Sequence, residues 1–322
     1  MGRTGVDLYP QQAGIGLADV QTFAKYLGGS ATNVAVAAAR YQRRTAIITR
    51  TGDDPFGRFV HAALRGYGVD DRYVTAVPWL PTPVTFCEIF PPDDFPLYFY
   101  RWPKAPDLEL TDEQLDLDAI RAAGVFWVTG TGLCAEPSRS ATLAALRARD
   151  RRGITVLDLD YRPMFWPSRE EARHWMQQAL PYVSVAVGNL DECGTAVGAR
   201  EPLTAAKALH EFGVDLAVVK QGPKGVLASQ GGRIVEVPPL PVTVLNGLGA
   251  GDAFGGALCH GLLSHGDLSH GHLSHTDLSH GDLEHVMRFA NAAGAIVASR
   301  LACSDAMPTA AEVTELLEGV DA

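Results

Sequence analysis

The sequence predicts an α/β fold: a central, mostly parallel sheet with helices on both faces, together with a small β-lid. From about residue 30 onward, apolar strand-like runs alternate with helical patterns of about 10–15 residues, which is typical of βαβ units. The chain has 322 residues, enough for two domains or for one large α/β domain with an appendage. The segment Thr82–Trp102 has two β-rich runs around Pro-Pro-Asp-Asp-Phe-Pro, which predicts a hairpin beside the main sheet.

The elements are predicted from the period of their apolar residues. Residues 55–67, for example, place their apolar side chains on one side of a helix. Residues 2–7 resemble the end of a first strand whose beginning is absent or short. The other predicted elements are helix 34–40, strand 45–49, helix 55–67, strand 125–129, helix 137–149, strand 155–158, helix 170–179, strand 183–187, helix 204–212, strand 216–220 and strand 242–245.

Composition and charge exclude several classes of protein. Apolar residues make up 47% and charged residues 20%, so the chain is an ordinary globular protein rather than a disordered one. The formal net charge is −10, and no basic cluster is present, so we expect no nucleic-acid binding. We also expect no membrane span and a cytoplasmic location, because no run of about 18 apolar residues and no secretory signal are found. The five cysteines are widely spaced, which argues against a disulfide framework or a zinc site.

A five-residue tandem repeat occupies about residues 263–285 and contains most of the ten histidines. One interpretation is a metal-binding tract. The other is a surface loop expanded by duplication, which we favour because a period of five matches neither a helix nor a strand. The histidines of the repeat are His265, His270, His272, His275, His280 and His285.

The segment Gly249-Ala250-Gly251-Asp252 follows a predicted strand and opens a helix. Glycines let the backbone approach a ligand, and the helix start presents unpaired N–H groups to an anion. Asp252 is either a helix cap or a base that takes a proton from an attacking hydroxyl. No Lys follows as in a P-loop, and Asp252 stands where a Rossmann motif needs its third glycine.

A second glycine turn, Gly28-Gly29, precedes a helix that carries Asn33 in its first turns. The amide of Asn33 offers both a donor and an acceptor, which suits a sugar hydroxyl. The alternative is a plain glycine turn in which Ser30 or Thr32 caps the helix.

Together, Gly28-Gly29-x-x-x-Asn33 and Gly249-Ala250-Gly251-Asp252 resemble the paired signatures of the ribokinase (PfkB-type) carbohydrate kinases. The resemblance covers residues 1–322 as one ribokinase-like kinase domain, with the β-lid at about 8–27 and 74–104. It implies a phosphotransferase with an alcohol group as acceptor, which uses ATP and Mg²⁺. Such a reaction depends on positioning and on electrostatic stabilisation of the phosphoryl group.

The resemblance also implies roles for individual residues. Asp252 would be the catalytic base, with the amides of Gly249, Ala250 and Gly251 as the anion hole. The residues implied to bind the sugar are Asp7, Gly29 and Asn33. Those implied to bind the nucleotide are Asn189, Glu192, Lys220, Gly222, Gly225 and Asn291, with Glu192 also holding Mg²⁺ through water. A solvated carboxylate at a helix start is the alternative for Glu192.

Two arginines suggest that the sugar is acidic. Arg162 follows a strand in Asp158–Trp166 and could fork onto a carboxylate, and Arg101 follows Tyr100 on the proposed lid. The alternative is that an arginine pairs with a protein carboxylate such as Asp160. Within the family, these segments resemble the kinases that phosphorylate the C6 hydroxyl of 5-dehydro-2-deoxy-D-gluconate in myo-inositol catabolism. Kinases of 2-dehydro-3-deoxygluconate are the alternative, and another sugar kinase of the family is a further one.

Three points stay open from the sequence. Asn246-Gly247 stands where the family usually has Asp-Thr, which leaves the monovalent cation open. A homodimer through the β-lid is expected from the family and from an uncovered strand edge. A non-catalytic sugar or nucleotide sensor on the same fold is the alternative from another class.

Overall fold

The computed structural model describes residues 1–265 and 278–321, and they divide into two compact units. The N-terminal unit consists of residues 2–109, 240–260 and 289–322. The central unit consists of Met1 and of residues 110–239 and 261–288. Helices α8 (Ala250–His265) and α9 (His280–Ala298) each have residues in both units.

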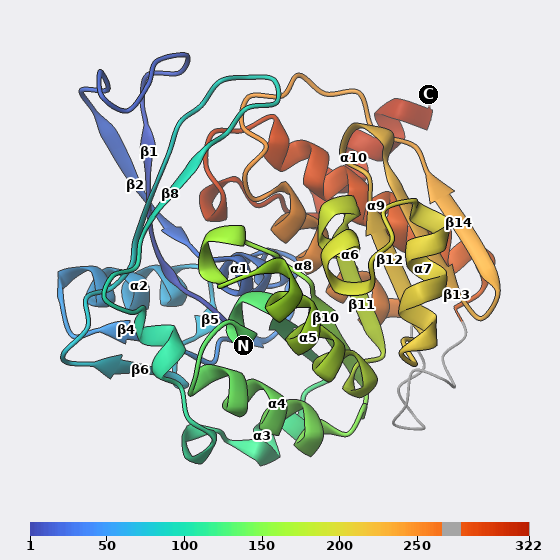
Figure 1. Cartoon of the computed structure of the whole chain (residues 1–322). Coiled ribbons are helices and arrows are strands. Elements are labelled where there is room, and N and C mark those ends of the chain that lie inside the picture. The colour runs from blue at the N-terminus through green and yellow to red at the C-terminus, as the bar shows by residue number, and fades with distance from the viewer. Residues whose placement is uncertain (266–277, 322) are drawn as a thin grey trace. The chain divides into compact units, whose positions relative to one another are not determined.

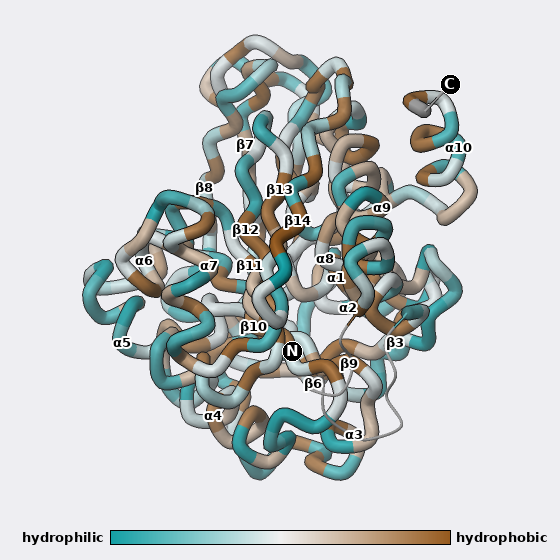
Figure 2. The backbone as a smooth tube through the Cα atoms, turned by 90° about the vertical axis from the view of Figure 1, so that its right-hand side faces the viewer, coloured by the Kyte–Doolittle hydropathy of each residue, from teal (hydrophilic) through white to brown (hydrophobic). Residues whose placement is uncertain are grey.

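The central unit is built on a mixed sheet with the strand order β14-β13-β12-β11-β10-β9. Strands β9 to β12 are parallel, and β13 and β14 are antiparallel, which confirms the mostly parallel sheet. In chain order the strands are β9 (Val125–Thr129), β10 (Ile154–Asp158), β11 (Val185–Asn189), β12 (Leu216–Lys220), β13 (Val226–Gln230) and β14 (Arg233–Val237). Figure 2 shows these apolar strands with helices α4 to α7 gathered on one side of them.

Burial explains why these segments form strands and helices. Every residue of β10, Ile-Thr-Val-Leu-Asp, is buried, so both faces of this strand are covered. Helix α5 begins where the Ser168 hydroxyl accepts a hydrogen bond from the Glu171 amide, and it buries Ala172, Met176 and Ala179 at helical spacing. The helices of this unit are α3 (Leu117–Ala122), α4 (Ser138–Arg149), α5 (Arg169–Ala179), α6 (Leu190–Val197) and α7 (Pro202–Glu211).

The N-terminal unit contains a sheet with the strand order β2-β1-β7-β8. Its strands are β1 (Gly5–Pro10), β2 (Phe23–Gly28), β7 (Val84–Cys87) and β8 (Leu97–Tyr100). Figure 1 labels β1, β2 and β8 of this sheet, in which β7 lies between β1 and β8. Strands β7 and β8 are antiparallel, which confirms the predicted hairpin. Two parallel pairs join β3 (Thr45–Ala46) to β5 (Val69–Asp70) and β4 (Thr49–Gly52) to β6 (Val74–Val77). The helices within this unit are α1 (Ser30–Arg40), α2 (Pro55–Gly66) and α10 (Ala310–Asp321).

Several predicted bounds were wrong. Residues 242–245 form no strand, because the Leu245 and Asn246 amides both donate to the Ala298 carbonyl at the end of α9. The predicted strand 45–49 is two short strands, β3 and β4. Helix α1 begins at Ser30 rather than at residue 34, and Asp7 lies in the middle of β1 rather than at its end. Helix α6 and the hairpin of β13 and β14 were not predicted from the sequence. None of the described helices is long and apolar enough to span a membrane.

Candidate active site

The glycine turn before α1 brings the backbone close to the start of β1. A Cβ atom on Gly28 would lie 2.2 Å from the Asp7 carboxyl group, so glycine leaves the room that this carboxyl group occupies. Gly29 has φ of 103°, and its Cβ would lie 2.4 Å from the Arg3 carbonyl oxygen. Positive φ and close approach both require glycine here. The alternative in which Ser30 or Thr32 caps the helix was wrong. The N-cap residue of α1 is Gly29, and no side chain caps this helix start.

Asn33 and Asp252 lie together in the N-terminal unit. The Asn33 side-chain Nδ2 donates to Asp252 Oδ2 at 2.8 Å. The orientation of the amide is fixed from its other side, because the Ser304 hydroxyl donates to Asn33 Oδ1 at 2.6 Å. Ser304 and Asn33 are buried, whereas Asp252 is half-buried. With Oδ1 of Asn33 facing the Ser304 hydroxyl, its NH₂ group faces Asp252.

The glycines before Asp252 shape the start of α8. Gly249 has φ of 82°, and its Cβ would lie 2.7 Å from the Cys303 sulfur, so no other residue fits without strain. Helix α8 begins at Ala250, and the first turn of any helix leaves N–H groups without intrahelical acceptors. The amides of Ala250 and Gly251 thus lie at the positive end of the helix dipole, in the same first turn as Asp252.

Asp7 is a buried carboxyl group in the same unit. Burial raises its pKa from 3.8 to about 7, and the negative charge of Asp252 adds to the rise. The positive charge of Arg3 and hydrogen bonds from Tyr9 and Thr85 act in the opposite direction. At neutral pH the group is therefore divided between its two protonation states, and both can hydrogen-bond to a sugar hydroxyl.

Tyr9 and Cys303 extend this cluster, and neither was assigned a role in the site from the sequence. The Tyr9 hydroxyl and the Cys303 sulfur are 2.6 Å apart, and both side chains are buried. Burial raises both of their pKa values, so both groups are neutral. Period-two alternation along β1 places Tyr9 on the same face as Asp7, which is the signal that could have identified it.

In the central unit, the predicted nucleotide residues lie at the carboxyl ends of adjacent strands. Asn189 ends β11, opposite Lys220 at the end of β12. Asn189 Oδ1 accepts from the amides of Asp191 and Glu192, and Glu192 Oε2 accepts from the Asn189 amide at 2.7 Å. This reciprocal capping box explains the spacing of the N-x-x-E motif. Glu192 is 4% exposed, so the solvated alternative for it was wrong.

The loop after β12 depends on its glycines. Gly222 and Gly225 have φ of 57° and 89°, and a Cβ on Gly225 would lie 2.0 Å from the Val237 carbonyl oxygen. The Gln221 amide donates to the Gly225 carbonyl and closes the turn. The loop therefore keeps its backbone at the carboxyl edge of the sheet, where ligands of open α/β sheets bind.

Both arginines chosen for a sugar carboxylate are paired with protein carboxylates. Arg162 Nη2 lies 3.0 Å from Asp160 Oδ1, and its Nη1 lies 3.7 Å from Glu192 Oε1. Arg101 Nη2 lies 3.1 and 2.8 Å from the two oxygens of Asp107. Both side chains therefore follow the alternative interpretation, in which each arginine pairs with a protein carboxylate.

The strand register also changes the aromatic residue expected near the sugar. Asp7 lies opposite Thr85, and Thr85 lies opposite Phe99. Because successive side chains alternate between the faces of a sheet, Phe99 shares the face of Asp7 and Tyr100 points to the other face. The Tyr100 side chain is 66% exposed there.

Asn291 and the histidine repeat can be located only in part. Asn291 is half-buried on α9. Of the repeat, His265, His280 and His285 are described, and His265 Nδ1 lies 3.2 Å from Asp282 Oδ1. His270, His272 and His275 lie outside the described residues. Within the described ranges, no group of three or more His, Cys, Asp or Glu side chains is placed to hold a metal ion.

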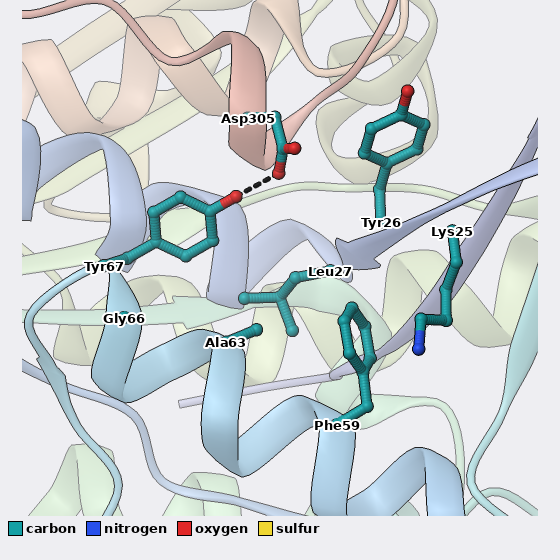
Figure 3. Close-up of a pocket in the computed structure, with 8 residues that line it drawn as sticks. All are labelled: Lys25, Tyr26, Leu27, Phe59, Ala63, Gly66, Tyr67 and Asp305. Carbon is teal, nitrogen blue, oxygen red and sulfur yellow. Dashed lines mark hydrogen bonds between the residues drawn. The ribbon is translucent and has the colours of Figure 1, made fainter.

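A separate pocket of about 330 Å³ lies between β2 and α2 (Figure 3). The Lys25 ammonium group is 3.9 Å from the centre of the Phe59 ring, and the Tyr67 hydroxyl donates to Asp305. Asp7, Asn33 and Asp252 are not among the residues that line it, so this pocket is distinct from the cluster around Asp252.

Comparisons with known proteins show the family of the chain. Residues 1–310 match the model of the pfkB family of carbohydrate kinases, so the chain belongs to that family. Its relatives include proteins named 5-dehydro-2-deoxygluconokinase. The one from Geobacillus kaustophilus is 31% identical over 99% of this chain and 92% of its own length, and the one from Bacillus subtilis is 30% identical over 99% and 94%.

A solved structure gives the same fold. A double mutant of Vibrio cholerae fructokinase, in its fructose-, ADP- and potassium-bound form, is 26% identical with a TM-score of 0.85. The match covers 98% of this chain and 96% of that chain. The fold is therefore ribokinase-like, and the chain is a phosphotransferase that acts on the hydroxyl group of a sugar.

Proposed function

We propose that the chain transfers the γ-phosphoryl group of ATP to the C6 hydroxyl of 5-dehydro-2-deoxy-D-gluconate, a keto-deoxy sugar acid of myo-inositol catabolism. The observation that carries the proposal is the Asp252 carboxylate, which is held by the Asn33 amide at the start of α8. The substrate rests on the names of the full-length relatives. The nucleotide rests on the ADP bound to the fructokinase.

Each group of the N-terminal unit has a part in the proposed reaction. Asp252 accepts the proton of the attacking hydroxyl, whose oxygen then bonds to phosphorus as ADP leaves. The amides at the start of α8 stabilise the negative charge on the transferring phosphoryl group. Asp7 and Asn33 orient the sugar, and the reacting hydroxyl is thereby held near Asp252.

Glu192 of the central unit would hold a magnesium ion only through water, because both of its oxygens already face donors. Mg²⁺ keeps several waters and binds one or two carboxylates together with substrate phosphates. Glu192 supplies one buried carboxylate, with Oε2 engaged by the Asn189 amide and Oε1 lying 3.7 Å from Arg162. The bound ion would neutralise charge on the phosphates of the nucleotide.

Asn246 bears on the monovalent cation. Its Nδ2 donates to the Leu301 carbonyl at 2.6 Å, and its Oδ1 accepts from the Leu248 amide. Because the Asn246 NH₂ group already donates to the Leu301 carbonyl oxygen, a cation is disfavoured at that oxygen. We therefore expect the rate to change less than about twofold when sodium replaces potassium, whereas a large loss would assign a potassium requirement.

We propose that a second copy of the chain binds the face of the β2-β1-β7-β8 sheet that carries Phe23, Phe86 and Tyr100. The edges and the face of the sheet expose aromatic side chains, with Phe23 against Phe86 and Phe86 against Tyr100, each pair at 5.4 Å between ring centroids. Contiguous exposed apolar surface of this kind marks interaction sites. Sedimentation analysis should show a homodimer that Tyr100→Glu dissociates. A monomeric wild-type protein at micromolar concentration would overturn this part of the proposal.

The proposed function is tested by ADP release with Mg-ATP and four acceptors: 5-dehydro-2-deoxygluconate, 2-dehydro-3-deoxygluconate, fructose and ribose. We expect a strong preference for the first. Preference for the second would keep an acidic substrate and change the pathway, and preference for fructose or ribose would overturn the acidic substrate. Folded protein that binds ligands without releasing ADP would favour the sensor.

A further inference from the structure

A carboxylate-bearing sugar needs a cation in its binding site, and the two arginines chosen from the sequence are paired with protein carboxylates. The Arg101–Asp107 pair is largely closed to solvent, with side chains that are 11% and 5% exposed. Removing a guanidinium from a buried carboxylate costs more than a new ligand contact returns. The other cations of the N-terminal unit are therefore further candidates for binding the sugar carboxylate.

Arg3 is a buried arginine beside the sugar cluster of Asp7, Asn33 and Asp252. It precedes β1, and its carbonyl oxygen accepts from the Thr32 hydroxyl and lies against Gly29. The backbone of Arg3 is thus fixed against the same glycine turn that leaves room for Asp7.

The side chain of Arg3 faces the sugar cluster. Its guanidinium carbon lies 5.6 Å from the centre of the Phe99 ring, and Phe99 shares the sheet face of Asp7. The side chain is only 8% exposed, and its charge acts directly on Asp7. A guanidinium near this ring and this carboxyl group has the fork geometry that binds a planar carboxylate.

We infer that Arg3 binds the carboxylate of the sugar acid and gives the enzyme its preference for acidic over neutral sugars. This inference rests on the proposed function, because it requires an acidic substrate. At neutral pH Asp7 is only partly ionised, so it balances the charge of Arg3 only in part. The carboxylate of the sugar would supply the rest of the negative charge. Arg3 is thereby a specificity-determining residue that binds the end of the sugar remote from the reacting C6 hydroxyl.

The test compares two acceptors in the same preparation of each variant. One acceptor is 5-dehydro-2-deoxygluconate, and the other is its neutral analogue, in which a hydroxymethyl group replaces the carboxylate. The ratio of the two kcat/KM values does not depend on the folded fraction, so partial misfolding of a variant cannot imitate the effect. We expect Arg3→Gln to lower this ratio about 10- to 100-fold, the usual worth of hydrogen bonds to a charged group. The KM for ATP should stay within about twofold.

Two further variants sharpen the result. Arg3→Lys keeps the positive charge but cannot form two parallel hydrogen bonds to a carboxylate. Its ratio of the two kcat/KM values should therefore lie between those of the wild-type protein and Arg3→Gln. Arg50→Gln is the matched control, because Arg50 is a buried arginine of the same unit that donates to the Glu109 and Ala76 carbonyls. Arg50→Gln should lose stability and keep the wild-type ratio.

The outcomes separate the two claims. An unchanged ratio in Arg3→Gln, with the wild-type protein still preferring the acid, would overturn the role of Arg3 and leave the proposed function standing. A wild-type protein that turns over the neutral analogue as well as the acid would overturn both. A ratio that falls equally in Arg3→Gln and in Arg50→Gln would mean that Arg3 acts only through the fold, which also contradicts the inference.

Discussion

Asp252 owes its proposed role to the groups around it. Its Oδ2 accepts from Asn33 Nδ2, and it lies in the first turn of α8, after the amides of Ala250 and Gly251. The sequence showed the motif, but its local pattern left a cap and a base as equal alternatives. The structure adds the contact with Asn33, which is 219 positions away in the sequence. No period or spacing could have predicted that pairing without the family resemblance.

The change Asp252→Asn keeps the size of the side chain and removes its ability to accept the hydroxyl proton. We expect kcat to fall by about 10²–10⁴-fold, with little change in the KM for ATP. Steady-state ADP release measures both quantities. Asp71→Asn is the control, because Asp71 pairs with His61 and Arg65 outside the cluster. Retention of most of the wild-type kcat in Asp252→Asn would remove this residue from its role.

Ser304 positions Asn33. Without its hydroxyl the Asn33 amide loses the donor that fixes its orientation, so Nδ2 is no longer directed only at Asp252. We expect Ser304→Ala to lower kcat about tenfold and to raise the KM for the sugar, with the KM for ATP unchanged. Ser299→Ala removes a hydroxyl that donates to a helix carbonyl in the same unit and should leave these values as they are. Equal losses in the two variants would mean a general effect on folding.

At the scale of elements, the sequence predicted the parallel strands well because they are buried on both faces. Strands β9, β10 and β12 fall within a residue of their predicted bounds. It failed where tertiary contacts decide the structure. Residues 242–245 look like a strand, but their backbone bonds to the end of α9. Helix α6 was missed for a different reason: it is short, and its local signal, the Asn189 and Glu192 capping box, was interpreted only as a nucleotide motif.

Arg149 joins two helices and a strand of the central unit. Its guanidinium donates to the Ile120, Arg121 and Gly124 carbonyls, and its side chain is fully buried. Burial lowers its pKa to about 10, so it stays charged at neutral pH. Arg149→Met would leave these carbonyls unsatisfied and should lower the free energy of unfolding by about 2–4 kcal/mol.

Urea unfolding of Arg149→Met beside Arg147→Met checks this prediction. Arg147 is exposed on the same helix, over the Tyr182 ring at 5.8 Å, and its loss should cost less than about 1 kcal/mol. Similar losses in both variants would show that the buried hydrogen bonds of Arg149 contribute little.

For the whole molecule, Asp7 makes stability depend on pH. The pKa of Asp7 is about 7 in the folded chain and near 3.8 when unfolded. Between these values the unfolded chain binds fewer protons than the folded chain, so this contribution to stability is full below about pH 4 and is lost as the pH rises through 7. Burial is the main cause of the raised pKa, and the charges of Arg3 and Asp252 and the hydrogen bonds from Tyr9 and Thr85 modify it.

Asp7→Asn removes the titrating group. The free energy of unfolding of the variant, measured from pH 4 to pH 8, should rise relative to that of the wild-type protein until about pH 7 and then level off. A constant difference between the two proteins across this range would contradict the raised pKa of Asp7.

The central claim is that this carbohydrate kinase forms one phosphoester on a keto-deoxy sugar acid. The most direct measurement is the identity of the product, by phosphorus NMR and mass spectrometry after incubation with Mg-ATP and 5-dehydro-2-deoxygluconate. We expect one equivalent of the C6 phosphoester for each ADP released. ADP matched by inorganic phosphate, or a phosphoester at another position of the sugar, would contradict the claim.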